Sequence, residues 1–379
     1  MEVDVSHASK NILRFCLLVL FCATPVQAAE ELDALLGQLL ATPAIQTAPG
    51  FTVKTLVAPG SFYDPFDLHS QGEVVWISDD GKESGDKGGR ILSVDAAGKV
   101  SVLFGLGKLL PPVALDVASA AFGDFVGQIF TVAFARPDAE AGFLVPNVIQ
   151  RLVPASGEVN NACTLPNNAK GEPGAGGFFL RFGPDGSPFA GKLFITAATN
   201  QTVYVMSADG HCAPFATIDM QRWGYPTGLA FTADGQTLLV GTAQPATHDP
   251  AGPPKHGAGK ILRVSASGVV ADEVFASGLD QPCAMLFAPA SFGAAAGQLL
   301  VADAGDFNSP VPMTQTVKHD GRVYRINALG KPELLAAGFA NPTGLAFLHG
   351  LLVVSDINGD FHVGQRELPD GYLVTIEAR

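Results

Sequence analysis

Short segments in which apolar and polar residues alternate recur from residue 51 to the C-terminus, separated by turns rich in glycine and proline. Alternation with a period of two is typical of a strand with one buried face. Three stretches align at once, because each begins with proline and continues with apolar residues: Pro226–Phe231, Pro282–Phe287 and Pro342–Phe347. Weaker copies begin at Pro65, Pro112 and Pro173. The chain therefore contains six units of similar length, each of which we expect to begin with a strand.

Each unit continues with further strand-like runs. Second strands are expected at 74–78, 128–132, 192–196, 237–240, 298–301 and 351–354. Third strands are expected at 90–94, 148–152, 203–206, 260–264, 322–326 and 372–376, and fourth strands at 100–104, 213–218, 273–276 and 333–336. Four short antiparallel strands repeated six times predict an all-β fold, a six-bladed β-propeller of four-stranded blades.

The sixth unit lacks a fourth strand of its own, since only Glu377, Ala378 and Arg379 follow its third strand. The run Phe51–Val57 lies just before the first unit and has the character of a fourth strand. We expect this N-terminal strand to complete the last blade and close the ring, which removes sheet edges that would otherwise be exposed.

The N-terminus resembles a targeting segment rather than part of the fold. Lys10 and Arg14 precede an apolar run over 15–23, and Val26-Gln27-Ala28 has the small residues that a signal peptidase accepts. The apolar run is too short for a membrane anchor. We predict a signal peptide over 1–28, a short amphipathic helix and linker over 29–50, and the propeller over 51–379. The protein is therefore expected to be secreted or periplasmic, with no membrane span.

Composition narrows the partners and the redox chemistry. The 23 Lys and Arg against 36 Asp and Glu give a net charge of −13 without a basic stripe, which argues against a nucleic-acid partner. After residue 28 three cysteines remain, Cys163, Cys212 and Cys283, so they cannot all pair within one chain. Cys163 and Cys212 fall near the outer strands of adjoining blades. Whether they form a disulfide depends on their distance and stays open.

Candidate chemistry concentrates in the long loops between second and third strands, which lie on one face of a propeller around its channel. Polar loops on a rigid scaffold are common places for binding and catalytic groups. His256, His319 and His362 fall in the loops of the fourth, fifth and sixth units. We name these three as candidate catalytic acids or bases. The alternative is that each is a solvated loop residue.

Acidic residues mark the same face. Asp79, Asp303 and Asp356 end the second strands of units one, five and six, which are neighbours in a closed ring. Their carboxylates are expected in one sector, where they could bind a cation such as calcium. The alternative is that each caps the following turn by accepting backbone N–H groups.

The sharpest local motif begins at Asp356. Oxygen-bearing side chains at Asp356, Asn358, Asp360 and Glu367 match positions 1, 3, 5 and 12 of a calcium loop. Phe361 occupies position 6, where an EF-hand needs glycine, so an EF-hand is excluded. A looser calcium site and a turn stabilised by Asp and Asn side chains both remain open.

A family resemblance can be stated on particular segments. Gly278–Pro282, Leu300–Asp303 and Gly321–Ile326 resemble the NHL-repeat propellers and the related superfamily of gluconolactonase and senescence-marker proteins. The gluconolactonase resemblance implies a divalent metal held by a Glu before the first blade and an Asn in a Pro-Asn-Gly turn. Here the first blade begins Asp64-Pro65-Phe66-Asp67, and the turns read Pro-Thr-Gly at 226–228 and 342–344.

These observations lead to one functional prediction and two alternatives. We expect an exported enzyme that acts on a small polar substrate, of sugar or lactone type, at the channel mouth, assisted by calcium or another divalent cation. The first alternative is a non-catalytic NHL-like propeller that binds a protein or glycan partner. The second is an oxidoreductase similar to the quinone-dependent sugar dehydrogenases, whose Arg-Asn-Pro turn corresponds to Ala340-Asn341-Pro342 here. The sequence identifies no substrate and leaves open whether the protein is an enzyme.

Overall fold

The structure is a computed structural model in which the chain divides into two units, Met1–Ala41 and Thr42–Arg379. It describes residues 43–80, 88–133, 137–138, 143–144, 148–167, 177–244, 255–305, 311–312, 319–358, 361–363, 366–367 and 369–379. For 137–138, 143–144, 311–312, 361–363 and 366–367 only the backbone is described. The predicted signal peptide and amphipathic helix lie outside these residues. Nowhere in the described ranges is there a helix long and apolar enough to cross a membrane.

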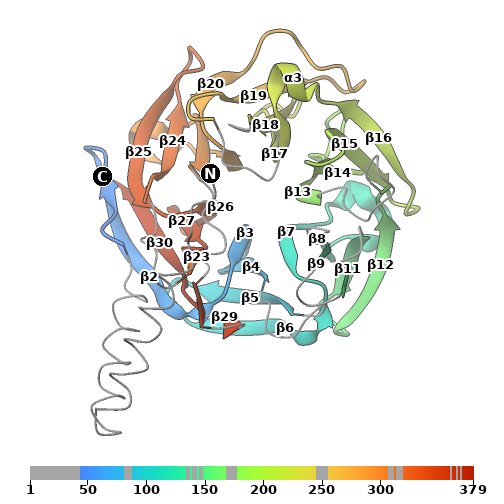
Figure 1. The fold of residues 1–379 in the computed structure, drawn as a ribbon, viewed down its shortest axis with the longest axis horizontal. Helices are drawn as coiled ribbons and strands as arrows, with labels where there is room; N and C mark the ends of the chain where they lie inside the picture. The colour runs from blue at the N-terminus through green and yellow to red at the C-terminus, as the bar shows by residue number, and fades with distance from the viewer. Residues whose placement is uncertain are drawn as a thin grey trace, which may run out of the picture. The chain divides into compact units, whose positions relative to one another are not determined.

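Six antiparallel sheets, five with four strands and one with five, follow one another around a ring (Figure 1). The first three blades, from the innermost strand outward, are β3(Pro65–Gln71), β4(Val74–Asp80), β5(Gly89–Asp95) and β6(Val100–Leu109); β7(Pro112–Val117), β8(Ile129–Ala133), β11(Val148–Val153) and β12(Glu158–Thr164); β13(Gly177–Phe182), β14(Lys192–Ala197), β15(Thr202–Ser207) and β16(Cys212–Thr217). The last three are β17(Tyr225–Phe231), β18(Leu238–Ala243), β19(Gly259–Val264) and β20(Ala276–Leu279); β21(Pro282–Phe287), β22(Leu299–Asp303), β24(Gly321–Ile326) and β25(Pro332–Phe339); β26(Pro342–Leu348), β27(Leu351–Asp356), β30(Gly371–Ala378) and β2(Phe51–Phe62). The predicted six-bladed propeller is confirmed.

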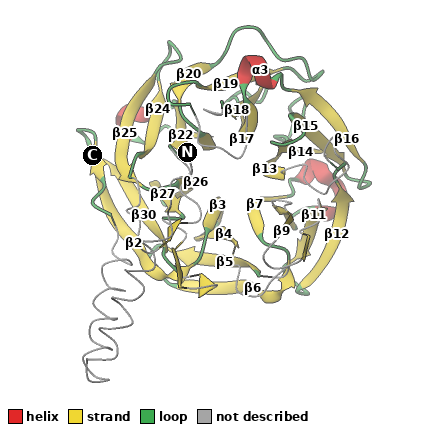
Figure 2. Cartoon of the chain, viewed as in Figure 1, coloured by secondary structure: helices red, strands yellow, loops and turns green. Residues whose placement is uncertain are grey.

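Among the residues that the structure describes, helices are few and short, as the strand-dominated cartoon in Figure 2 shows. They are α3(Met220–Trp223) and the 3₁₀ segments η2(Ala120–Phe125) and η3(Gly293–Ala295). The α3 turn is capped by Asp219, whose carboxylate accepts the backbone N–H groups of Gln221 and Arg222. This turn leads directly into the first strand of the fourth blade.

The ring is closed by the N-terminal strand, as predicted. β2 pairs antiparallel with β30, from Phe51 opposite Ala378 to Phe62 opposite Gly371. One further strand was not expected: β1(Gln46–Thr47) pairs with β25 and adds a fifth strand to the fifth blade. The segment before the propeller therefore covers part of an outer sheet edge before the chain enters the sixth blade.

Parts of the long loops pair with one another. β9(Pro137–Asp138) pairs with β10(Phe143–Leu144) within the loop of the second blade. β23(Val311–Pro312), from the loop of the fifth blade, runs parallel to β28(Phe361–Val363), which also pairs with β29(Arg366–Glu367). The loops of the fifth and sixth blades are therefore neighbours, as the order of the blades predicts.

Every innermost strand has a register shift near its start, at Pro65/Asp67, Pro112/Ala114, Gly177/Leu180, Pro226/Leu229, Pro282/Met285 and Pro342/Gly344. Such bulges bend a strand and redirect its side chains. They also bring neighbouring inner strands close together: a Cβ atom on Gly228 would lie 1.6 Å from the carbonyl oxygen of Cys283. Only glycine fits at this contact between the fourth and fifth blades.

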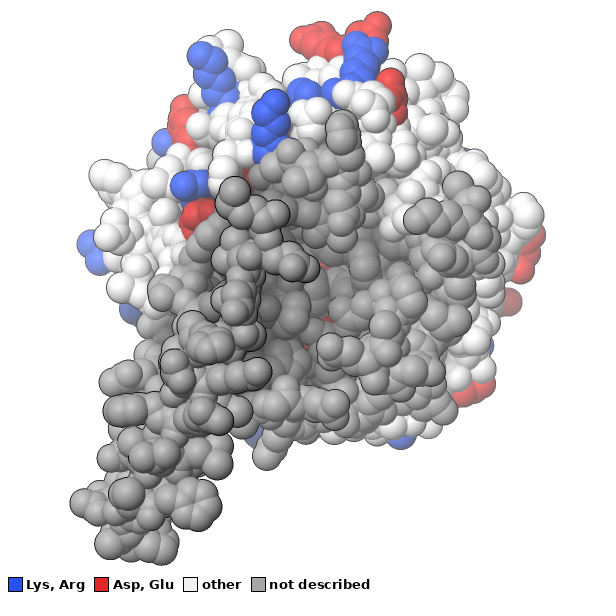
Figure 3. Space-filling model, viewed as in Figure 1, with Lys and Arg blue, Asp and Glu red and all other residues white. Residues whose placement is uncertain are grey.

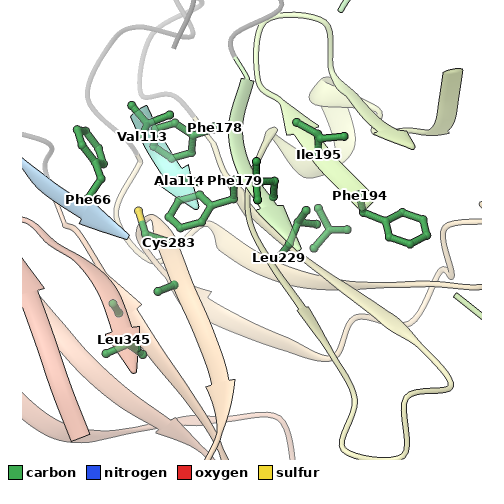
Figure 4. Packing of buried hydrophobic residues seen from close by; sticks show 14 of the residues in the cluster. Phe66, Val113, Ala114, Phe178, Phe179, Phe194, Ile195, Leu229, Cys283 and Leu345 are labelled. Atoms are coloured by element: carbon green, nitrogen blue, oxygen red, sulfur yellow. The ribbon is translucent and has the colours of Figure 1, made fainter. Parts of the chain in front are cut away.

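Apolar side chains occupy the space between the inner strands. Phe66, Val113, Phe178 and Cys283 are buried and come from four different blades (Figure 4). The rings of Phe66 and Phe178 lie 6.5 Å apart at the centroids, edge to face. This packing across the ring holds the first and third blades together through apolar burial.

Cys163 on β12 and Cys212 on β16 form a disulfide, with Cα atoms 6.2 Å apart. It joins the outermost strands of the second and third blades. The pairing that the sequence left open is therefore made, and Cys283 is a buried free thiol.

Several strand boundaries differ from the prediction, and two strands begin later than expected by more than one residue. In the fourth blade the outer strand begins at Ala276, where the predicted strand ended, because residues 272–274 are not paired with β19 and lie between two backbone contacts to it. These contacts are Ala271 N–H to Arg263 O and Phe275 N–H to Ile261 O. In the third blade the inner strand begins at Gly177; Pro173 lies outside the described residues.

Candidate functional site

Inner strands begin and second strands end at the same side of the ring, which we call the mouth face. Pro65 lies opposite Asp79, Pro282 opposite Asp303 and Pro342 opposite Asp356. The three predicted aspartates therefore hold equivalent positions in blades one, five and six, and all three are buried. In Figure 3, most of the visible charged side chains lie toward the edge of the ring, and small acidic areas are visible between the grey residues near its centre.

The carboxylates of Asp303 and Asp356 accept backbone N–H groups from the residues that precede their own inner strand. Asp303 accepts from Asp280 at 2.9 Å and from Gln281 at 2.6 Å. Asp356 accepts from Ala340 at 2.9 Å and Asn341 at 3.0 Å, and from the Tyr372 hydroxyl at 2.6 Å. These bonds satisfy the buried carboxylates and fix the entry of each inner strand.

Asp79 occupies the equivalent position in the first blade, but its carboxylate has a cationic partner. Its Oδ1 accepts the backbone N–H of Tyr63 at 2.9 Å, and its Oδ2 accepts two N–H groups of Arg90, the Nε at 2.7 Å. The Arg90 guanidinium also stacks on the Tyr63 ring, 4.8 Å from its centroid. Arg90 is the residue opposite Asp79 on the third strand, so the first blade satisfies its aspartate with a salt bridge.

Burial shifts the proton affinity of these groups. It raises the pKa of Asp303 to about 6, although the N–H groups of Asp280 and Gln281 oppose the shift. Burial likewise raises the pKa of Asp79 to about 6 against the opposing charge of Arg90. The pKa of Asp356 is also raised by burial, and that of Tyr372 lies well above its usual value because of burial and the nearby Asp356 carboxylate.

The predicted calcium loop is described only in part. Asn358 is buried with a φ of 56°, its backbone N–H donates to Asp356 Oδ1 at 2.6 Å, and its side-chain amide donates to the carbonyl of Asp370 at 3.2 Å. This geometry is that of a tight turn closed by Asp and Asn side chains. Asp360 lies outside the described residues, so its predicted role stays a prediction.

The carboxylate oxygens of Asp79, Asp303 and Asp356, which the prediction assigned to a metal, accept hydrogen bonds within the protein. In the described part of the chain, no three His, Cys, Asp or Glu side chains are grouped so as to hold a metal ion. The carboxylates of Asp79, Asp303 and Asp356 accept N–H or O–H groups, whereas a calcium site presents oxygens toward one centre. As bonded here these residues do not fit calcium, and their metal role stays a prediction.

His256 is the predicted catalytic residue with a defined partner. Its Nδ1 lies 3.2 Å from Oδ2 of Asp280, and the imidazole is 59% exposed while the carboxylate is 8% exposed. A buried carboxylate at Nδ1 orients the ring and turns Nε2 away from the contact, which is the arrangement of an acid–base histidine.

Asp280 also receives a guanidinium. Nη1 of Arg322 lies 3.4 Å from the same Oδ2, and the Arg322 side chain is 36% exposed. Gly257 N–H donates to Oδ1 at 2.6 Å, and the backbone N–H of Asp280 is held by Asp303. An imidazole and a guanidinium therefore converge on one carboxylate at the mouth face, and Asp303 positions that carboxylate. We call His256, Asp280 and Arg322 the mouth triad.

The other two candidate histidines are less defined. His319 is exposed, next to Asp320 at the end of the loop of the fifth blade. His362 lies on β28, where only the backbone is described. Their proposed acid–base roles stay predictions.

Sequence reasoning missed Asp280 and Arg322. Asp280 directly precedes Gln281-Pro282, and Arg322 faces Asp303 on the neighbouring strand. The sequence signal that could have identified Asp280 is its position. An acid just before an inner strand faces the loop of the preceding blade, and His256 lies in that loop. Asp67, near the start of the first blade, accepts two N–H groups of Arg181.

No protein-family profile and no curated protein matches the chain. Solved structures with the same fold include a gluconolactonase from Xanthomonas campestris, 15% identical, covering 89% of this chain and 94% of that one with a TM-score of 0.54. They also include a protein described as a glucose dehydrogenase-type oxidoreductase from Thermus thermophilus. It is 16% identical, the match covers 86% of this chain and 100% of that one, and the TM-score is 0.52. A third is the calcium-binding regucalcin from Agrobacterium tumefaciens. It is 14% identical, the match covers 87% of this chain and 96% of that one, and the TM-score is 0.51. The chain therefore shares the six-bladed propeller fold of these proteins, and at these identities the likeness concerns the fold alone.

Proposed function

We propose that the protein is an exported enzyme that hydrolyses a small polar ester of the sugar-lactone type at the mouth face. The observation that carries the proposal is the convergence of His256 and Arg322 on Oδ2 of Asp280, at 3.2 and 3.4 Å. A partly exposed base beside a partly exposed cation, both held by a buried acid, is a combination that ester hydrolysis can use. The names of structures with the same fold, which include a gluconolactonase, agree with this substrate class.

In the proposed reaction His256 removes a proton from water as the water oxygen bonds to the lactone carbonyl carbon. Asp280 stabilises the resulting imidazolium, and Arg322 stabilises the negative charge that develops on the carbonyl oxygen. The ring C–O bond then breaks, and the leaving alkoxide takes the proton from His256. Every proton is accounted for by these residues and one water molecule.

Export is supported by the disulfide between Cys163 and Cys212. Disulfides form and persist in oxidising compartments and are rare in the cytosol. Together with the predicted signal peptide over 1–28, this pairing favours a secreted or periplasmic protein. We assign no step to calcium, because the carboxylates expected to bind it are hydrogen-bonded within their blades.

A non-catalytic propeller is the second candidate. The structural bonds of Asp79, Asp303 and Asp356 favour it, because they explain the equivalent blade positions of these acids without any reaction. Such a protein would use the same loops to bind a protein or glycan.

The experiment that separates the candidates is an activity panel on the purified chain from residue 29. Hydrolysis of glucono-δ-lactone and other sugar lactones is followed by pH-stat, and oxidation of sugars by dye reduction with added quinone cofactor. We expect lactone hydrolysis above the spontaneous rate. Sugar oxidation without hydrolysis would favour the dehydrogenase-like alternative, and no turnover of either kind would favour the binding protein. Thermal unfolding with EDTA and with Ca²⁺ tests the metal separately, since a bound ion stabilises the native state.

A further inference from the structure

A groove of about 560 Å³ lies between the fourth and fifth blades at the face opposite the mouth. Its lining includes Arg263 at the end of β19, Phe275 before β20, Phe287 at the end of β21 and Leu329 in the turn between β24 and β25. A groove of this volume is large enough to hold a ligand of a few residues. It is remote from the mouth triad in the fold, because these elements end at the opposite side of the blades.

The groove results from the short outer strand of the fourth blade. β20 pairs with β19 only from Gly259 to Ile261, whereas β25 in the fifth blade pairs along β24 from Gly321 to Ile326. The preceding residues 272–274 are not paired with β19 and lie between two backbone hydrogen bonds to it, of 2.9 and 2.7 Å. The wall of the groove is thus fixed at both ends.

Arg263 supplies a positive charge; Glu273 also lines the groove, but no ion pair joins the two side chains in the described structure. The Arg263 guanidinium lies 4.7 Å from the centroid of the Phe275 ring, and within the described ranges it forms no ion pair. By contrast, Arg90, Arg181 and Arg325 each contact a carboxylate. A guanidinium that stacks on a ring keeps its N–H edge available for the two oxygens of a carboxylate.

Gln298 supplies an uncommitted acceptor. It lines the groove, its Nε2 donates to the carbonyl of Ala294 at 3.3 Å, and its Oε1 is buried without a hydrogen-bond partner among the described residues. A buried acceptor without a partner is costly and calls for a donor. Phe275 and Phe287 are partly buried, and Leu329 is 82% exposed at the rim. An apolar ligand group would cover this surface.

We propose that this groove binds an extended peptide segment of a partner protein that carries an apolar side chain next to a carboxylate. The apolar side chain packs on Phe275, Phe287 and Leu329, a peptide N–H donates to Gln298 Oε1, and the carboxylate pairs with Arg263. A peptide provides these three features, an apolar group, an N–H donor and a carboxylate, in adjacent positions. The site does not depend on the reaction at the mouth.

The test uses N-acetyl-leucyl-phenylalanine with a free C-terminal carboxylate and the same dipeptide as its amide, titrated calorimetrically into the protein. We expect saturable binding of the acid and about tenfold weaker binding of the amide, because a charge-assisted hydrogen bond is lost. Arg263→Leu should weaken binding of the acid by a similar factor and remove the preference for it over the amide. Gln298→Leu should weaken both probes.

Matched controls come from the second blade. Arg151 stacks on Phe125 at the same 4.7 Å, and Gln128 Oε1 is also buried without a partner in the described structure, yet neither residue lines the groove. Arg151→Leu and Gln128→Leu should bind the acid as the unchanged protein does. Leu329→Ser, at an exposed position that folding does not need, should weaken binding several-fold. Equal affinity for acid and amide, an unaffected Arg263→Leu variant, or no saturable binding of either probe would overturn the proposal.

Discussion

Arg181 of the third blade forms a two-point salt bridge with Asp67 of the first blade: Nη1 lies 2.7 Å from Oδ2, and Nη2 lies 2.8 Å from Oδ1. Asp67 is fully buried and also accepts the backbone N–H of Leu115 in the second blade at 3.2 Å. One carboxylate therefore connects the inner strands of three consecutive blades. This connection lies among the apolar side chains that fill the centre of the ring, where an unpaired charge would be poorly solvated.

Removing one partner of this pair should be strongly destabilising. We expect Arg181→Met to lower the free energy of unfolding by about 3–5 kcal/mol, because it leaves the buried Asp67 carboxylate without its counter-charge. The double variant with Asp67→Asn should recover part of the loss. Urea unfolding of the two single variants and the double variant measures the coupling. A loss below about 1 kcal/mol in Arg181→Met would show that the pair does not hold the blades together.

A second network beside it extends the connection. Nδ1 of His69 lies 2.8 Å from Oδ1 of Asp116, whose Oδ2 accepts the backbone N–H of Phe182 at 2.7 Å. Burial opposes ionisation of Asp116, but the hydrogen bond and charge of His69 and the charge of Arg181 outweigh it, so the pKa of Asp116 lies below its ordinary value. The inner strands of blades one to three are thus joined by charged groups.

The close approach of inner strands gives a steric prediction. Gly228→Ala would bring a Cβ atom to 1.6 Å from Cys283 O, so the fourth and fifth blades must separate locally. We expect a loss of about 3 kcal/mol or more in the free energy of unfolding, the upper range for overpacking. Gly105→Ala is the control, since its Cβ would meet only Val102 at an ordinary 3.6 Å. Equal stability of the two variants in urea would contradict the packing described.

The disulfide should contribute measurably to stability. Cys163 and Cys212 are separated by 49 residues, and closing a loop of that length in the unfolded chain corresponds to about 4 kcal/mol in the chain-entropy model. We expect the Cys163→Ser/Cys212→Ser variant to unfold at lower urea concentration by an amount equivalent to about 2–4 kcal/mol. Thiol titration of the denatured, unreduced chain from residue 29 should find one free thiol, that of Cys283. Three free thiols would exclude the disulfide.

The raised pKa of Asp303 predicts a pH dependence of stability. Its value of about 6 in the fold exceeds the ordinary 3.8, so the folded protein binds this proton more tightly than the unfolded chain does. The stabilisation from this proton is complete below about pH 4 and is lost as the pH rises through about 6. Relative to Asp303→Asn, the free energy of unfolding of the unchanged protein should therefore fall by up to about 3 kcal/mol between pH 4 and pH 7. A difference that stays constant, or increases, over this range in urea titrations would contradict the assigned burial.

The fold was predictable because its signal is repeated. Proline at the start of the inner strand and alternation in the following strands recur in most units, so an error in one unit, such as the fourth strand of the fourth blade, does not change the blade count. The closing strand was predictable because the sixth unit ends at Arg379 without a fourth strand. Residues 272–274 lie outside the strand pairing, and the alternation of apolar and polar residues gives no signal for this interruption.

The site was predictable only in part. His256 and Asp303 were identified because they lie in or next to a long polar loop. That both contact Asp280 could not be predicted, because it depends on how the chain brings the fourth and fifth blades together. Arg181 and Asp67 are 114 residues apart, in blades that do not adjoin, and no local pattern connects them. The aspartates at the strand ends show a different limit. Their positions suggested a cation, and in the structure their carboxylates accept N–H groups from residues just before the inner strand of their own blade, so their metal role stays a prediction.

The most direct test of the mouth triad is the ratio of kcat/KM for His256→Ala and for His349→Asn on the same sugar lactone. His349 is also partly exposed and paired with an acid, Glu73, but it lies on the opposite face, and asparagine accommodates its φ of 50°. We predict that His256→Ala loses about 10²- to 10⁴-fold in kcat/KM, the usual contribution of a general base, while His349→Asn is unchanged. Equal kcat/KM for both variants and the unchanged protein would show that His256 takes no part in the reaction.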